Sequence, residues 1–234
     1  SDVSLDAPLV FAGYGASEPS LGYDDYAGID VRGKVVLVVR GAPEKFSSSV
    51  MSHTMNPTTI LKAAAEHGAI GVMICPSDST SRMGNTRGGQ YSVIDKDGSV
   101  VISRTFYSDQ VKVLGLLSYA VFNSLVKDAG KSIPAMVTQM KGGQPSSFPL
   151  SGSLKLAYTS AYNDIISYNV VGKIEGSDPK LKNEYVVHSA HLDHLGIGRP
   201  VEGDSIYNGA HDNASGVASV LAISGIYHNI KERP

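Results

Sequence analysis

The chain has 234 residues, of which 42% are hydrophobic and 18% charged, and this composition is typical of a folded protein with one or two domains. Its formal net charge is −2 and no basic run occurs, which argues against nucleic acid or an anionic membrane surface as a partner. The single cysteine, Cys75, excludes an internal disulfide bond, and no apolar stretch reaches the roughly 20 residues of a membrane span. The first residues lack the pattern of a signal peptide.

The first part of the chain alternates strand and helix patterns, which favours an α/β fold. Residues 34–40 form a β-branched run that predicts a strand buried on both faces. Residues 56–68 predict a helix, in which Asn56 caps the first turn and Gly68 ends the last. Residues 69–75 predict a second buried strand. This order indicates two parallel strands joined by a crossover helix.

The same arrangement is predicted a second time, further along the chain. Residues 111–117 predict a strand, a helix capped by Ser118 runs to Ala129, and residues 133–140 predict the strand that follows. Between the two arrangements, residues 76–91 are polar and rich in glycine, so we expect a long exposed loop.

Three carboxylates, Asp24, Asp25 and Asp30, precede the first buried strand in a segment rich in turn residues. Carboxylates on loops are rarely buried. We therefore interpret these side chains as part of a solvated turn and not as a binding site.

A change of composition at residues 141–153 predicts a domain boundary, because glycine, proline and serine dominate there. The sequence thus divides into a first domain over residues 1–145 and a second over residues 150–234. Gly and Pro in such number favour a connecting segment over a helix or a strand.

The second domain begins with strand patterns at residues 154–158 and 167–176. Residues 184–190 predict its most apolar strand, and a helix follows over residues 210–229 after an Asn-Gly turn signal. In open α/β sheets, ligands gather outside the carboxyl ends of the strands, often where a helix begins. We therefore expect a site after residue 190 and at the start of this helix.

Two short motifs at these positions carry metal-binding chemistry. His191 and Asp193 are two residues apart, so on an extended chain their side chains point the same way. A metal-bound imidazole usually donates its other N–H to a carboxylate, which fixes the tautomer and makes the ligand more basic. His-x-Asp alone is a frequent pattern, but Asp212 follows 21 residues after His191, between a glycine-containing loop and a helix start. A carboxylate in that place can bridge two cations.

The stretches EYVVHSAHLDHLG and NGAHDNASGVASVL resemble the zinc aminopeptidase family that includes glutamate carboxypeptidase-like enzymes and the transferrin receptor ectodomain. The resemblance implies two Zn²⁺ ions as cofactor. It implies that His191 is a ligand of one zinc, that Asp212 bridges both, and that Asp193 is the catalytic residue that supports His191. It also implies a cis peptide bond between Asp212 and Asn213.

The first half of the chain carries a second resemblance. VFAGYGASEPSLGYDDYAGIDVRGKVVLVVRG and LKAAAEHGAIGVMICPSD are similar to the opening of a protease-associated (PA) domain. Together, the resemblances imply an α/β protein. They imply an α+β PA domain with a β-rich core over residues 1–145, followed by the start of a doubly wound α/β zinc-peptidase sheet over residues 150–234.

The family also uses a Glu-Glu pair, a further acidic ligand and a distal histidine, and none of these can be placed in this sequence. The resemblance therefore implies a fragment of a two-zinc exopeptidase, inactive by itself because its glutamate base and remaining ligands lie beyond Pro234. The parent enzyme is expected to be an aminopeptidase that hydrolyses the N-terminal bond of a peptide substrate, although a carboxypeptidase stays open. The family further implies an extracellular or periplasmic location.

Two alternatives remain. The chain could be a non-catalytic module whose PA domain binds a substrate or a protein, or an enzyme similar to glutaminyl cyclase, which shares only the catalytic fold. The retained His191, Asp193 and Asp212 favour descent from an active peptidase, and the PA domain argues against the cyclase. His194 and His211 flank these residues, and we interpret them as hydrogen-bonding neighbours or structural residues. The oligomeric state is not predicted.

Overall fold

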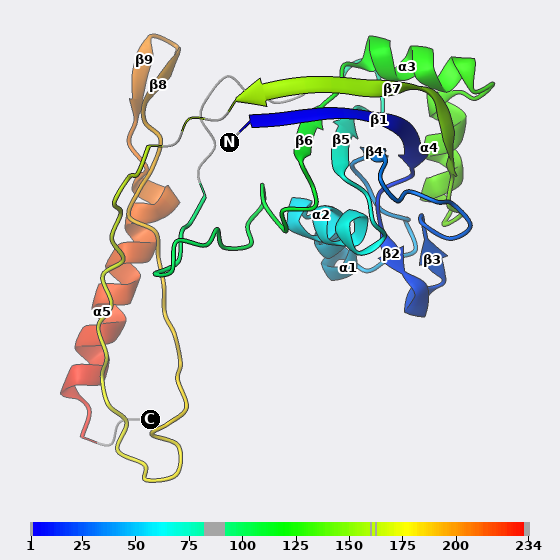
Figure 1. The fold of residues 1–234 in the computed structure, drawn as a ribbon. Coiled ribbons are helices and arrows are strands. Elements are labelled where there is room, and N and C mark those ends of the chain that lie inside the picture. Colours follow the sequence, from blue (N-terminus) through cyan, green and yellow to red (C-terminus); the bar gives the residue numbers. More distant parts are fainter. Residues whose placement is uncertain (1, 82–91, 160, 162, 232–234) are drawn as a thin grey trace. The chain divides into compact units, whose positions relative to one another are not determined.

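The computed structural model divides the chain into two compact units, Ser1–Tyr162 and Asn163–Pro234 (Figure 1). The described residues are 2–81, 92–159, 161 and 163–231. Most of the loop predicted over residues 76–91 therefore lies outside the described residues.

Unit 1 contains a five-stranded sheet with the strand order β6-β5-β4-β1-β7. Its strands are β1 (Asp2–Ala12), β4 (Val35–Val39), β5 (Gly71–Cys75), β6 (Val113–Leu116) and β7 (Ser147–Thr159). The first four are parallel to their neighbours, whereas β7 is antiparallel to β1. Two short strands, β2 (Ser17–Glu18) and β3 (Tyr23–Asp24), pair with each other after β1. The mixed sheet with its helices confirms the α/β class.

Helices cover both faces of this sheet (Figure 1). They are α1 (Ser48–Thr54), α2 (Pro57–Glu66), α3 (Tyr119–Asp128) and α4 (Ile133–Lys141). Successive side chains of β4 point to opposite faces, so Val36 and Val38 pack with α2, whereas Leu37 belongs to the cluster of α3 and α4. Every residue of β4 is buried, as the β-branched run predicts.

The local helix signals in unit 1 are confirmed. The Asn56 side chain accepts a hydrogen bond from the Thr58 N–H at 3.0 Å, which caps α2, and Gly68 has a φ of +89° just after that helix. Ser118 caps α3 in the same way through the Val121 N–H. Strands β4 and β5 precede and follow α2 in the sequence, and they pair with each other in parallel. The strand-helix-strand prediction is therefore confirmed as well.

The strand predicted over residues 133–140 is wrong, because these residues form α4. Ser132 caps its first turn, and Ile133, Met136 and Met140 lie three and four residues apart and are buried together. This spacing is that of one helix face, and it fits a strand period of two poorly.

The interpretation of Asp25 as part of a solvated turn is also wrong. Its side chain is 0% exposed, and its carboxylate accepts hydrogen bonds from the N–H groups of Tyr14 and Ala16 and from the Tyr23 hydroxyl. The turn after β1 leaves buried N–H groups that need an acceptor, and this carboxylate supplies it. Asp30 lies at the surface as predicted.

The first unit extends beyond the boundary predicted near residue 145. Strand β7 pairs with β1 along nearly its whole length, from Asp2 opposite Thr159 to Ala12 opposite Ser147. This long ladder holds residues 147–159 in unit 1, although the composition of residues 141–153 predicts a connecting segment.

Unit 2 contains a hairpin of β8 (Gly196–Val201) and β9 (Asp204–Tyr207), a π-type turn at Ala210–Ala214, and helix α5 (Ser215–Asn229). Helix α5 confirms the helix predicted there. The structure has no strand at residues 167–176 or 184–190, because no described segment of the unit pairs with them and a strand requires ladder partners. None of the described helices has the length and hydropathy needed to cross a membrane.

Candidate functional site

The predicted metal-binding residues lie in unit 2, on two segments separated in sequence by the β8–β9 hairpin. His191 lies in an irregular segment just before β8, and Asp212 lies in the turn that leads into α5. The structure brings them together, with His191 Nε2 at 2.9 Å from Asp212 Oδ1. The two motifs therefore meet at one place, where an imidazole nitrogen faces a carboxylate oxygen.

Asp193 contacts the other side of the same imidazole. His191 Nδ1 lies 2.7 Å from the backbone carbonyl oxygen of Asp193, whereas its distance to the Asp193 carboxylate is 3.7 Å. The Asp193 side chain is 96% exposed. The orienting acceptor for His191 is thus the carbonyl, a group that serves this purpose in metal sites as a carboxylate does.

Both contacts of His191 favour its protonated form. The hydrogen bond from Nδ1 to the Asp193 carbonyl raises the pKa of His191 above its usual value, and the nearby Asp212 carboxylate raises it further. Each ring nitrogen faces an acceptor, so an imidazolium with two N–H groups satisfies both. A divalent cation at Nε2 replaces the proton on that nitrogen, which is how metal and proton compete for such a ligand.

The turn that carries Asp212 has an unusual backbone. The Asp212–Asn213 peptide bond is cis, as the family resemblance implies, and Asp212 has φ −119° and ψ 85°, outside the helical region. The Ser215 hydroxyl donates to the His211 carbonyl at 2.8 Å across this turn. Asp212 therefore lies on a non-helical step immediately before α5.

The donor set fits part of a zinc site. A tetrahedral Zn²⁺ with bonds of about 2.0–2.1 Å keeps its nitrogen and oxygen ligands about 3.3 Å apart, so the 2.9 Å between His191 and Asp212 must widen only slightly. Catalytic zinc sites use three protein ligands. Among the described residues, no three His, Cys, Asp or Glu side chains are close enough to hold one metal ion together.

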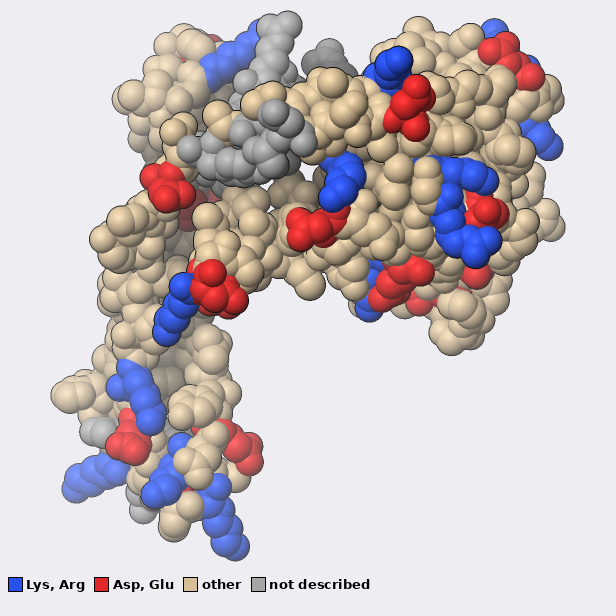
Figure 2. Space-filling view, in the orientation of Figure 1, with Lys and Arg blue, Asp and Glu red and all other residues tan. Residues whose placement is uncertain are grey.

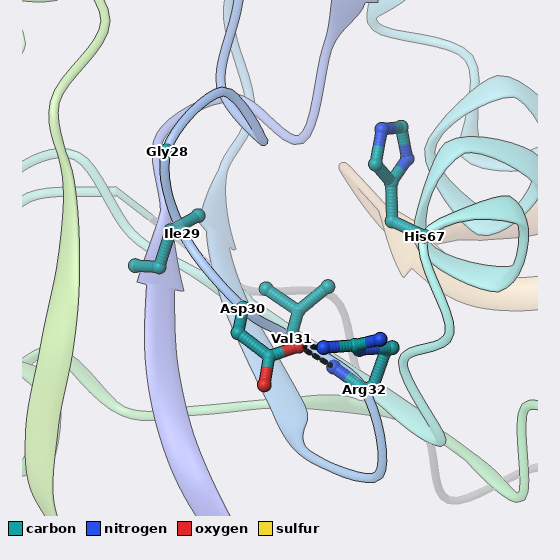
Figure 3. A pocket seen from close by; sticks show the side chains of 6 residues that line it. All are labelled: Gly28, Ile29, Asp30, Val31, Arg32 and His67. Carbon is teal, nitrogen blue, oxygen red and sulfur yellow. Dashed lines mark hydrogen bonds and ion pairs between the residues drawn. The ribbon is translucent and has the colours of Figure 1, made fainter.

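A hollow in unit 1, about 310 Å³ in volume, has no counterpart in the sequence analysis (Figure 3). It is lined by Gly28, Ile29, Asp30, Val31, Arg32 and His67. Arg32 donates from Nε to Asp30 at 2.9 Å, so its guanidinium is engaged within the lining, and the His67 ring stacks on Tyr26. On the face in view in Figure 2, side chains of both charges are interspersed, with no broad region of one sign. Neither feature indicates a particular ligand.

Comparison with known proteins gives two family matches. The model of the PA domain matches residues 5–109, and the model of Peptidase family M28 matches residues 169–234. Comparison with curated proteins gives no significant match. Among solved structures, an aminopeptidase from Aneurinibacillus sp. strain AM-1 is 18% identical with a TM-score of 0.27, over 67% of this chain and 27% of that one. The chain thus spans about a quarter of the length of that protein.

Proposed function

We propose that the chain is part of a two-zinc metallo-exopeptidase, because residues 169–234 match the model of Peptidase family M28 and residues 5–109 match the model of the PA domain. We propose an aminopeptidase, which hydrolyses the N-terminal bond of a peptide. One observation carries the metal-dependent chemistry: His191 and Asp212, distant in sequence, meet at 2.9 Å within the part that matches the peptidase family.

Each residue of the site has a defined role in this proposal. His191 would hold one zinc through Nε2, while the Asp193 carbonyl accepts from Nδ1 and holds the ring in that tautomer. Asp212 would be the carboxylate ligand shared by both ions. When bound, zinc would polarise the scissile carbonyl and lower the pKa of a water molecule. The general base and the remaining ligands are not among the residues identified here, so we propose that they come from sequence outside this chain.

The exposed apolar surface of unit 2 supports the proposal that the catalytic domain is incomplete in this chain. None of its described residues is buried, and valines of the two predicted strands stand in solvent, with Val170 98% exposed. Val171, Val186 and Val187 are also exposed. Apolar runs of this kind belong inside a sheet that has helices on both faces. We therefore propose that unit 2 is the first part of a catalytic domain.

Zinc binding and peptidase activity test the proposal separately. We expect the chain to bind Zn²⁺ weakly, and His191→Ala or Asp212→Asn to abolish that binding in a calorimetric titration. The chain alone should release no chromophore from aminoacyl p-nitroanilides in the presence of zinc, and zinc-dependent release would contradict its incompleteness. A Glu-Glu pair in the coding sequence beyond Pro234 would support the two-zinc enzyme.

A binding module is the second candidate function, because only two of the three ligands of a catalytic zinc site come together among the described residues. In that case, the PA domain binds a substrate or a protein and unit 2 does no chemistry. A stop codon directly after Pro234 in the natural gene, together with no zinc binding, would favour this function. We also propose an extracellular or periplasmic location, supported by the family resemblance alone and testable by cell fractionation.

A further inference from the structure

We propose that His194 is a positioning residue that holds the Asp212 carboxylate in the orientation required by a divalent cation. The proposal rests on the metal-binding function proposed above and adds a third side chain to it. His194 lies in the same irregular segment as His191, three residues further on.

The two histidines approach different oxygens of one carboxylate. His191 Nε2 lies 2.9 Å from Asp212 Oδ1, and His194 Nδ1 lies 4.0 Å from Oδ2. This distance exceeds that of a direct hydrogen bond and is within the range of an ion pair when the imidazole is protonated, so protonated His194 attracts the carboxylate without a direct hydrogen bond to it. A carboxylate approached from both sides has fewer orientations than one held by a single contact, so less entropy is lost when a cation binds.

The ring of His194 is itself fixed by its surroundings. Its side chain is 25% exposed, against 50% for His191 and 70% for Asp212, so it is the most shielded of the three. A Cβ atom on Gly209 would lie 2.7 Å from His194 Cγ, which shows how closely the ring packs on the turn before Asp212. The Tyr207 ring lies on β9 with its centroid 6.5 Å from that of His194. Packing against Gly209 and Tyr207 therefore sets the ring position independently of Asp212.

Gly209 is required at this place for two reasons. Its φ of +66° is in the left-handed region, and a side chain there would collide with the His194 ring and with the Asp212 carbonyl oxygen. Groups that hydrogen-bond or orient metal ligands typically change metal affinity 10–100-fold when they are removed. His194 has the geometry for an effect at the lower end of that range, because its contact is long.

The test uses two substitutions of His194 that separate positioning from packing. His194→Asn keeps an N–H donor close to the position of Nδ1, whereas His194→Leu keeps apolar bulk against Gly209 and removes the donor. Zinc affinity of the whole chain is measured by NMR titration with Zn²⁺ alone, which detects weak binding. We expect the Kd to rise about tenfold in His194→Leu and to stay within about threefold of the original in His194→Asn. His211→Asn, on the turn before Asp212, is the matched control and should bind as the original chain does.

Each outcome decides the proposal. Unchanged affinity in His194→Leu overturns it, and equal losses in the Leu and Asn variants overturn it in favour of His194 as a direct ligand. If the original chain itself binds no zinc, the proposed function and this inference both fall, whereas the first two results leave the proposed function standing. Should His194→Leu reduce the helical circular dichroism signal of the chain, His194→Gln provides a second route. Its N–H donor lies further from the backbone than Nδ1, so its Kd should rise towards the tenfold value, and a Kd equal to that of His194→Asn overturns the proposal.

Discussion

Asp25 has an unusual environment for an acidic residue, because its carboxylate lies in unit 1 with no exposed surface. Its three hydrogen bonds fasten the turn after β1, and its backbone carbonyl accepts the Ser147 hydroxyl at 2.6 Å, which ties the turn to β7. Burial raises the pKa of Asp25 to about 7, because loss of hydration penalises the charged form more than the three hydrogen bonds favour it. The neighbouring Asp24 raises the pKa of Asp25 further.

This raised pKa predicts a stability that falls as pH rises. Between the unfolded value of 3.8 and the folded value of about 7, the unfolded chain has lost the Asp25 proton and the folded chain still holds it. The unfolded state then binds fewer protons, so the free energy of unfolding decreases across this window, by up to about 4 kcal/mol at 1.36 kcal/mol per pKa unit. Asp25→Asn does not titrate and should lose this slope, as measured by urea unfolding followed in the near-ultraviolet circular dichroism of the tyrosines. Asp24→Asn is the control and should keep most of the slope, because Asp24 makes only the smallest contribution to the raised pKa of Asp25. An equal slope in the original chain and in Asp25→Asn would contradict the assignment.

At the scale of elements, helices α2 and α3 could be predicted because their signals are local. Asn56 and Ser118 cap them, and glycines follow both helices with positive φ. Helix α4 differs from its predicted strand because a repeat of the earlier strand-helix-strand order does not determine the local structure, whereas Met136 and Met140 are spaced for a helix face. The strand patterns at residues 167–176 and 184–190 indicate only that these segments are suited to pair with another strand. Whether a strand forms depends on distant partners, which a local pattern does not contain.

The cap of α2 gives an element-scale prediction. The Asn56 side chain satisfies the Thr58 N–H, one of the first N–H groups of the helix that have no partner within it. Asn56→Ala should lower the free energy of unfolding of unit 1 by about 1 kcal/mol, and Asn56→Asp, which keeps the acceptor, should change it little. Urea unfolding measures both variants, and equal losses would show that the cap does not stabilise α2.

The contact between β1, α3 and β7 gives a second prediction at this scale. Phe11 is completely buried on β1, with its ring centroid 5.6 Å from Phe122 and 5.3 Å from Phe148. Phe11→Ala leaves a cavity among three elements and should cost about 3–5 kcal/mol, whereas Phe11→Leu retains most of the apolar volume and should cost clearly less. Chemical denaturation of the two variants ranks them. Similar losses for Ala and Leu would mean that the site collapses around the smaller side chain.

For the whole molecule, the sequence predicts which residues come together at the site better than it predicts the fold around them. The positions of His191 and Asp212 relative to strand ends and helix starts predict a shared site, and the structure brings the two side chains together. The carbonyl of Asp193 as the acceptor for His191 could not be predicted, because it depends on the local bend of an irregular segment. The extent of unit 1 depends on the pairing of β7 with β1, two segments at opposite ends of that unit. A local composition pattern does not contain this pairing.

The distribution of buried residues predicts unequal stability for the two units. Both core clusters lie between Leu5 and Leu150, whereas no described residue of unit 2 is buried. Burial of apolar surface is the main source of folding free energy, so residues 1–162 should fold alone and unfold cooperatively with nearly the midpoint of the same unit in the whole chain. Residues 163–234 alone should give little cooperative unfolding and should bind a hydrophobic dye, because their valines and isoleucines are exposed. Hydrogen exchange on the whole chain checks the same point, with slow amides expected in β4 and β5 and fast ones in residues 164–195. Slow exchange in that second segment would mean that unit 2 forms a core of its own.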